Sequence, residues 1–142
     1  MTRPYLPAEM ALVDIDETNR GFYEACRAHQ LTIQRCVHCG HFQHPPRALC
    51  SECHSFDLEW APVSGRGAVF SYTIVHHPIG PVADRVPFNV VTVELEGTGG
   101  ARVVSNVIDA APDDVEIGLP VEVTFEQMSD ELTLPRFVRR TR

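Results

Sequence analysis

The sequence predicts a mainly β protein, in which a short N-terminal helical segment precedes a small cysteine-rich ribbon and a five-stranded barrel. Three observations predict this fold class: a helical period before residue 31, two closely spaced cysteine pairs, and short alternating runs after Trp60. With 142 residues, the chain has room for one ordinary domain or two small ones.

The composition is that of a globular protein, with 44% hydrophobic and 22% charged residues. The 19 acidic residues outnumber the 12 basic ones, all of which are Arg, and the formal net charge of −7 opposes general nucleic-acid binding. Because the sequence has no Lys, it excludes a Schiff-base lysine and a P-loop within this chain. No run approaches the roughly 20 apolar residues of a membrane span, and residues 1–7 lack a signal-peptide core, so we expect a cytoplasmic protein.

The helical period runs from Thr18 to Ala28, with Phe22 and Cys26 one turn apart on the same face. A reactive thiol needs a neighbouring base or cation, and the sequence places none beside Cys26. We therefore expect Cys26 to be a small buried side chain that packs beneath Phe22, and we predict no catalytic residue here.

The two cysteine pairs have the spacing of a zinc site. Cys36 and Cys39 form the first CxxC pair, and Cys50 and Cys53 form the second after ten intervening residues. Each pair can hold two thiolates on one turn, and the two turns can face each other as a tetrahedron. The sequence therefore predicts one structural Zn²⁺ per chain in a rubredoxin-like zinc ribbon.

Two alternatives to this site exist. A disulfide could close each CxxC pair, or nearby histidines could compete as ligands, namely His38, His41, His44 and His54. Gly40 follows the first pair, where a positive φ lets backbone N–H groups point at the sulfurs, and His54 occupies the matching place after the second pair. Since four thiolates fill the coordination shell and leave no position for water, the zinc is not expected to be catalytic.

Five short runs after Trp60 have the pattern of half-buried strands separated by turns. Val91, Val93 and Leu95 alternate with polar residues, and Val121, Val123 and Phe125 do the same. The fifth run contains Pro135, which we expect at a sheet edge or at a break. The runs are Ala68–His77, Pro87–Glu96, Ala101–Asp109, Leu119–Gln127 and Leu132–Arg139, with a loop or single helical turn over 110–118. Five strands at this spacing predict an OB-fold barrel, with a small sandwich as the alternative.

These segments divide the chain into three parts. We predict an N-terminal helical segment over residues 1–31, the zinc ribbon over 32–60 and the OB-fold domain over 61–142. The basic C-terminal residues Arg136, Arg139, Arg140 and Arg142 are expected to form a solvated tail.

Several segments carry, in order, a resemblance to a known family. They are Leu31–Gly40, Pro45–Cys50, Leu58–Trp60, Ser64–Gly67, Ser71–Thr73, Ser105–Asn106, and Ile117–Gly118 followed by Val121–Val123. This ordered set resembles the acyl-CoA-associated zinc-ribbon/OB-fold family, long catalogued as a domain of unknown function. The resemblance covers residues 19–138.

The resemblance implies a function. Members of that family look like non-catalytic partners of thiolases and of lipid-transfer-type aldolases, in which the partner supplies the reactive residues. We therefore expect an accessory subunit in a hetero-oligomer with a thiolase-fold protein, which stabilises the complex and helps to form the channel for a CoA ester. A free-standing module that binds acyl-CoA or single-stranded nucleic acid is the alternative.

A CoA ester carries phosphates, which the planar guanidinium group of Arg binds well. Arg47 lies between two prolines and the second cysteine pair, and Arg66 lies between two glycines where the barrel begins. Tyr72 offers an aromatic face on which a base could stack. These three residues are the predicted CoA contacts.

Overall fold

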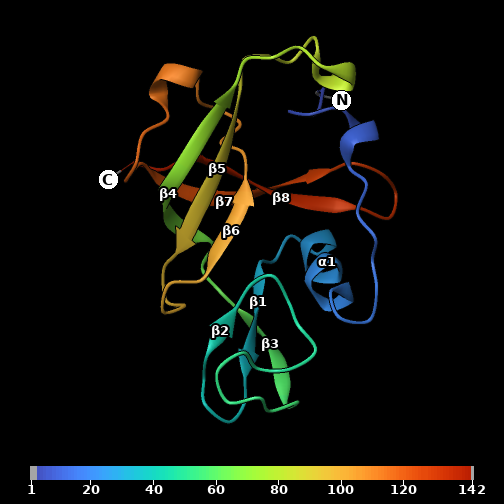
Figure 1. Cartoon of the computed structure of the whole chain (residues 1–142), viewed down its shortest axis with the longest axis vertical. Coiled ribbons are helices and arrows are strands. Elements are labelled where there is room, and N and C mark those ends of the chain that lie inside the picture. The colour runs from blue at the N-terminus through green and yellow to red at the C-terminus, as the bar shows by residue number, and fades with distance from the viewer. Residues whose placement is uncertain (1–2, 142) are drawn as a thin grey trace.

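The computed structural model describes residues 3–141. A three-stranded ribbon lies at one end of the molecule and a five-stranded barrel at the other, with the only α-helix of the described residues, α1, beside the junction (Figure 1). The predicted fold class is thereby confirmed. The helical elements are η1 (Ala8–Met10), α1 (Arg20–Arg27), η2 (Gly80–Val82) and η3 (Pro112–Asp114), and the strands are β1 (Thr32–Cys36), β2 (Phe42–Gln43), β3 (Leu58–Pro62), β4 (Arg66–Val75), β5 (Phe88–Leu95), β6 (Arg102–Ser105), β7 (Pro120–Gln127) and β8 (Thr133–Arg139).

The ribbon is an antiparallel sheet in the order β2-β1-β3, so β1 is the central strand. Helix α1 packs beside it because Gly21 has no side chain: a Cβ atom there would overlap the indole of Trp60 on β3. Phe22 and Cys26 face inward from the same helix and are 4% and 0% exposed. The expected burial of Cys26 on the Phe22 face is thus confirmed.

The barrel sheet has the order β6-β5-β4-β7-β8, and all of its strand pairs are antiparallel. Its two outer strands meet where Val107 forms a parallel bridge with Phe137. The N–H group of Phe137 donates to the carbonyl of Asn106 at 3.0 Å, and Ile108 N–H donates to Phe137 O at 2.9 Å. These bonds close the sheet into the predicted OB-type barrel, which removes most of its exposed edge.

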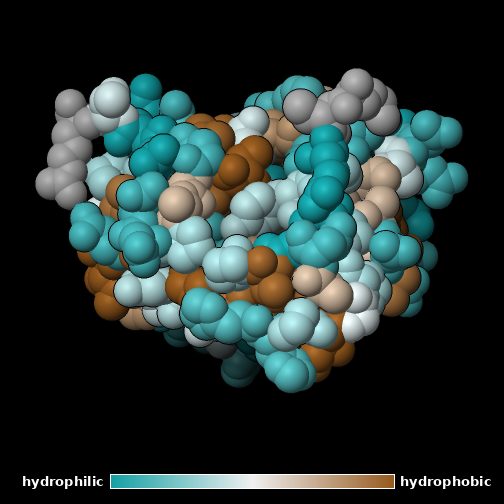
Figure 2. All heavy atoms as spheres, turned by 90° about the horizontal axis from the view of Figure 1, so that it is seen from above, coloured by the Kyte–Doolittle hydropathy of each residue, from teal (hydrophilic) through white to brown (hydrophobic). Residues whose placement is uncertain are grey.

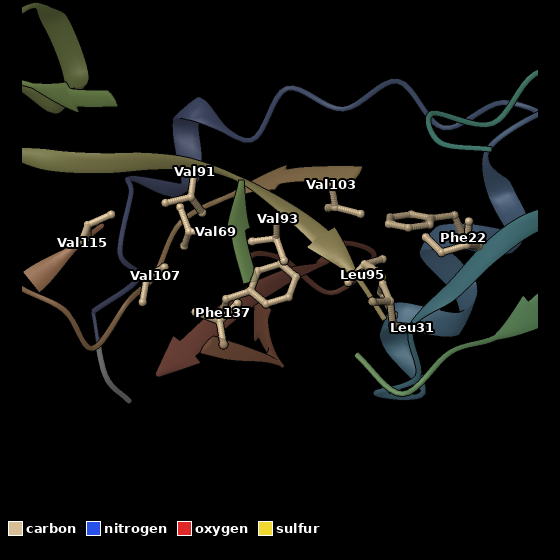
Figure 3. Packing of buried hydrophobic residues seen from close by; sticks show 13 residues of the cluster. Phe22, Leu31, Val69, Val91, Val93, Leu95, Val103, Val107, Val115 and Phe137 are labelled. Carbon is tan, nitrogen blue, oxygen red and sulfur yellow. The ribbon is translucent and has the colours of Figure 1, made fainter. Parts of the chain in front are cut away.

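One hydrophobic core extends from the barrel to α1. Val91, Val93 and Leu95 point inward from β5 as their alternation predicts, and Phe137 is completely buried among them. Figure 3 shows the barrel residues at one end of this cluster and Phe22 with Leu31 at the other. The helix, the start of the ribbon and the barrel therefore share buried surface.

One strand prediction differs in detail from the structure. The predicted run 101–109 pairs with β5 only as far as Ser105, because the chain then crosses to β8. Pro135 lies within β8 at the end of the sheet order, where a missing N–H group is tolerated, so its expected place at a sheet edge is confirmed. The segment 110–118 contains the single helical turn η3, as expected.

The prediction of a solvated C-terminal tail is wrong for Arg136, which lies within strand β8, whereas Arg139 is exposed as expected. Arg136 is only 7% exposed, and its guanidinium donates to Glu126 at 3.1 Å and to Asn106 at 2.8 Å. Arg139 pairs with Asp109, and Arg140 pairs with Glu96. Residues 136–139 are thus part of the barrel strand β8, which pairs with β7, and acidic side chains neutralise their guanidinium groups. Arg142 lies outside the described residues.

The end of the barrel far from the ribbon has a mixed surface. Figure 2 shows hydrophobic residues there in separate patches, with hydrophilic residues between them. Of residues 3–141, none forms a helix both long enough and apolar enough to cross a bilayer.

Candidate metal centre and adjoining pockets

The four cysteines of the two CxxC pairs converge at the tip of the ribbon. Their sulfur atoms all lie within 4.8 Å of one another, and no other ligand-type side chain of the described residues joins this cluster. The Sγ atoms of Cys36 and Cys53 are 3.5 Å apart, and those of Cys39 and Cys50 are 3.6 Å apart. All four cysteines are free, so no disulfide closes either CxxC pair.

The two turns that carry the cysteines have the same backbone geometry. Gly40 N–H donates to Cys36 O, and His54 N–H donates to Cys50 O, each at 2.9 Å. Gly40 and His54 both have positive φ, at 77° and 65°, as each turn requires. Backbone N–H groups then point at sulfur: Cys39 N donates to Cys36 Sγ, and Cys53 N donates to Cys50 Sγ, both at 3.5 Å.

This arrangement fits zinc. Zinc–thiolate bonds of about 2.3 Å in a tetrahedron place the sulfurs about 3.8 Å apart, close to the shortest separations in the cluster. Cys36, Cys39, Cys50 and Cys53 are therefore positioned to bind one Zn²⁺ ion. Four thiolates leave no open position for a substrate or a water molecule, so the site suits a structural role.

The protonation of the thiols explains why a cation is needed. The hydrogen bond from Cys53 N–H is the main cause that lowers the pKa of Cys50 to about 6, and the bond from Cys39 N–H lowers the pKa of Cys36. At Cys39, a backbone bond from His41 acts in the same direction, but desolvation and the neighbouring sulfurs outweigh it and raise the pKa to about 12. Two of the thiols thus ionise readily, and a metal ion must stabilise the full set of thiolates.

The four nearby histidines do not join the cluster. The Nε2 atom of exposed His38 lies 2.7 Å from Asp57, and that of half-buried His41 lies 4.0 Å from Glu52. His54 completes the second turn through its backbone. His44 lies elsewhere, against Phe22.

Two glutamines that the sequence analysis missed order the loop between the cysteine pairs. Gln34 and Gln43 are 5% and 6% exposed, and their side chains are hydrogen-bonded to each other. Gln34 also binds both the N–H and the carbonyl of Arg47 at 2.9 Å, and the Gln43 carbonyl accepts from Ser51 N–H at 2.9 Å. The sequence gives little signal for their burial, because long polar side chains such as Gln are usually exposed. Their position on strands of the ribbon is the only hint.

The backbone of Arg47 is thereby fixed, while its side chain is exposed and forms no ion pair with the described residues. It lines a pocket of about 260 Å³ between β2 and the β5–β6 turn, together with Arg102, His41, His44, Gly99 and Gly100. The guanidinium of Arg102 lies 3.6 Å from the ring centroid of Phe70 and 3.3 Å from a Glu94 oxygen. We name this cavity the arginine pocket; it combines one free and one partly neutralised guanidinium.

The other two predicted CoA contacts lie on β4 and do not line the arginine pocket. Arg66 is the first residue of β4, and Tyr72 is 42% exposed near the middle of that strand. The structure therefore does not bring Arg66 and Tyr72 together with Arg47, and their roles stay predictions.

A second feature missed by the sequence analysis is the position of His44. Its ring packs on Phe22 with centroids 5.0 Å apart. It lines the arginine pocket and also two smaller pockets, of about 180 and 130 Å³, that share Phe22 and Tyr23. The smaller of these, which we name the α1–β6 pocket, is completed by Val103, Val104, Leu134, Pro135 and Arg136.

Cys26 lies apart from all of these pockets and is 0% exposed. Burial raises the pKa of its thiol to about 12. A thiol held in this state is a poor nucleophile, which agrees with a packing role.

Comparison with known proteins identifies the family. The ChsH2 rubredoxin-like zinc ribbon domain matches residues 24–59, and the ChsH2 C-terminal OB-fold domain matches residues 60–126. A DUF35 domain-containing scaffold protein of Methanothermobacter thermautotrophicus is 37% identical over 116 residues, which cover 81% of this chain and 86% of that protein. The chain belongs to the DUF35 family.

Two other relatives of this DUF35 chain have names that mention enzymes. A probable enoyl-CoA hydratase alpha subunit of Thermomonospora curvata is 42% identical over 123 residues, which cover 87% of this chain but 38% of the relative. The chain therefore spans little more than a third of that protein. A chain of a solved structure named Ltp2-ChsH2(DUF35) aldolase is 40% identical, with a TM-score of 0.81 over 89% of this chain and 98% of that one.

Proposed function

We propose that this DUF35 chain is a non-catalytic accessory subunit of a thiolase-superfamily enzyme, a thiolase or a retro-aldolase, that acts on acyl-CoA esters. Its role is to stabilise the complex and to contribute to the CoA-binding channel. The observation that carries the proposal is the 40% identity, over nearly the whole matched chain, to a component of a structure named as an aldolase.

The cysteine residues of the chain support a non-catalytic role. The four ribbon cysteines are the ligand set of a closed metal site, and Cys26 is buried with a raised pKa. Acyl transfer or carbon–carbon bond cleavage needs a positioned nucleophile or base, and we expect the partner subunit to supply it.

A contribution to CoA binding is supported by the arginine pocket. Arg47 has a hydrogen-bonded backbone and a guanidinium that forms no ion pair with residues 3–141, and Arg102 lines the same pocket. Guanidinium groups bind phosphate oxygens in bidentate fashion, and CoA carries a diphosphate and a 3′-phosphate. Arg66 and Tyr72 are the two further contacts predicted from the sequence, at a separate place on β4.

A second candidate is an accessory role for a hydratase. The 42% identity to part of a probable enoyl-CoA hydratase alpha subunit favours it. Both candidates place the chain beside an enzyme for acyl-CoA esters, and they differ in the fold of the partner.

Co-expression separates the two candidates. The tagged chain is produced together with a thiolase-superfamily protein or an enoyl-CoA hydratase from the same organism, and the complexes are isolated by size-exclusion chromatography. We expect a stable hetero-oligomer with the thiolase-superfamily protein and a higher yield of soluble, active enzyme when both are present. Recovery of the chain alone, or of a complex only with the hydratase, would contradict the proposal.

Arg47→Ala tests the CoA contribution within that complex. Loss of one charged contact to phosphate should raise the KM for the CoA ester about 10-fold or more and leave assembly intact. Arg20→Ala on the exposed surface of α1 is the matched control, and it should leave KM unchanged.

A further inference from the structure

We propose that His44 is a specificity-determining residue, which hydrogen-bonds the pantetheine arm of a CoA ester in the α1–β6 pocket. This inference deepens the proposed function and rests on it. It assigns the arm of the ligand to one pocket and its phosphates to the arginine pocket next to it.

The first argument is the position of the ring. His44 lines both the arginine pocket and the α1–β6 pocket, and it is the residue of the ribbon loop that the two have in common. The two pockets also follow each other along β6, because Ala101 and Arg102 line the first and Val103 and Val104 line the second. An extended ligand that enters the α1–β6 pocket from the arginine pocket therefore passes His44.

The second argument is an unsatisfied polar atom. Nδ1 of His44 is buried without a hydrogen-bond partner, and no hydrogen bond to either ring nitrogen occurs within residues 3–141. Buried polar groups are normally satisfied, and an unpartnered one destabilises the protein. A half-turn of the ring exchanges the positions of Nδ1 and Cδ2, so Nδ1 can leave its buried position and offer a hydrogen bond to a ligand in the pocket.

The third argument is the charge of the site. Burial lowers the pKa of His44 to about 4, so the ring is neutral at pH 7 and has one donor and one acceptor. Arg136 lines the same pocket, but Glu126 and Asn106 already occupy its guanidinium. The remaining lining comes from Tyr23 and from apolar side chains, chiefly Val103, Leu134 and Pro135.

These properties favour the pantetheine arm over the nucleotide. The arm is uncharged and slender, with two amides and a hydroxyl group between apolar carbons, which suits a neutral imidazole among aliphatic side chains. The phosphates carry negative charge, which suits Arg47 and Arg102. The charge of the two adjoining pockets is therefore complementary to the two parts of a CoA molecule.

His44→Phe tests the inference, because it keeps an aromatic ring against Phe22 and removes both nitrogens. Binding of CoA and of adenosine 3′,5′-bisphosphate, which lacks the arm, is measured by calorimetry on the zinc-loaded full chain. We expect CoA to bind the variant about 3- to 10-fold more weakly and the bisphosphate to bind equally well. The variant should also melt about 3 °C higher or more, because an unsatisfied buried nitrogen has been removed.

In this variant the affinity for CoA should fall while the melting temperature rises. A loss of packing would lower both, so the experiment separates ligand recognition from packing. If the melting temperature rises and CoA binds as before, or if both ligands lose affinity equally, the inference is overturned while the proposed function stands. If the wild-type chain binds neither ligand, its proposed contribution to the CoA channel fails as well. His76→Phe, on an exposed histidine, is the control and should leave both affinities unchanged.

Discussion

The ribbon and the barrel are stabilised by different forces. In the ribbon, four cysteines within 18 residues of sequence converge on one point, and two buried glutamines hold the loop between them. In the barrel, side chains from five strands meet around Phe137, and strands distant in sequence close the sheet. A metal site supplements the small part of the hydrophobic core that the ribbon shares, whereas the barrel buries enough apolar surface to fold by burial.

Removing zinc gives the largest expected effect. Structural zinc contributes about 10–16 kcal/mol of apparent binding free energy in zinc-finger peptides, so chelation or Cys36→Ser should unfold the ribbon. Trp60, the single tryptophan, lies on β3 of the ribbon, and its fluorescence reports this change directly. Amide exchange in β4–β8 should stay slow, and elemental analysis of the wild type should find about one zinc per chain.

Cys26→Ala is the control for that experiment, and its zinc content should be unchanged. If chelation instead exposed the amides of β4–β8 together with those of the ribbon, the two regions would form one cooperative unit. The contrast between a metal-stabilised and a burial-stabilised region would then be wrong.

Phe137→Ala should produce the next largest effect, and in the other region. The side chain is 0% exposed, so its removal leaves a cavity in the barrel and should lower the free energy of unfolding by about 3–5 kcal/mol. Denaturant unfolding followed by circular dichroism measures the change. The zinc content should stay at about one per chain, and loss of metal would show that the ribbon depends on the barrel core.

Gln43→Met tests the polar network of the ribbon. It removes an amide that bonds Gln34, the Leu49 carbonyl and Ser51 N–H, so unsatisfied groups remain and the free energy of unfolding should fall by about 1–3 kcal/mol. Unfolding followed by Trp60 fluorescence gives the value. The same substitution at exposed Gln30 should change stability by less than about 0.5 kcal/mol.

Arg35→Gln should have the smallest effect. The guanidinium lies 3.9 Å from Glu59, and both side chains are 46% exposed, so solvent screens the pair. We expect a loss of about 0.5 kcal/mol or less by the same fluorescence measurement. A loss above 1 kcal/mol would mean that surface charge, in addition to metal and polar contacts, stabilises the ribbon.

The sequence predicted features that depend on local spacing. The CxxC pairs, the glycine after the first pair and the alternation of Val91, Val93 and Leu95 follow from the geometry of a turn or a strand over a few residues. The end of β6 at Ser105 was not predictable, because it depends on the crossing to β8, about 30 residues further along the chain. The burial of Arg136 was missed because its partners, Glu126 and Asn106, are brought to it by the sheet.

Sequence alone determined the metal ligands, the class of fold and the absence of lysine chemistry, since each depends on residue type and short-range spacing. Only the tertiary structure decided that Arg47 shares a pocket with Arg102 while Arg66 and Tyr72 lie elsewhere. It also decided that His44 lies at the junction of two pockets with a buried nitrogen unsatisfied. Pockets form between elements distant in sequence, and their lining depends on how those elements pack rather than on any local pattern.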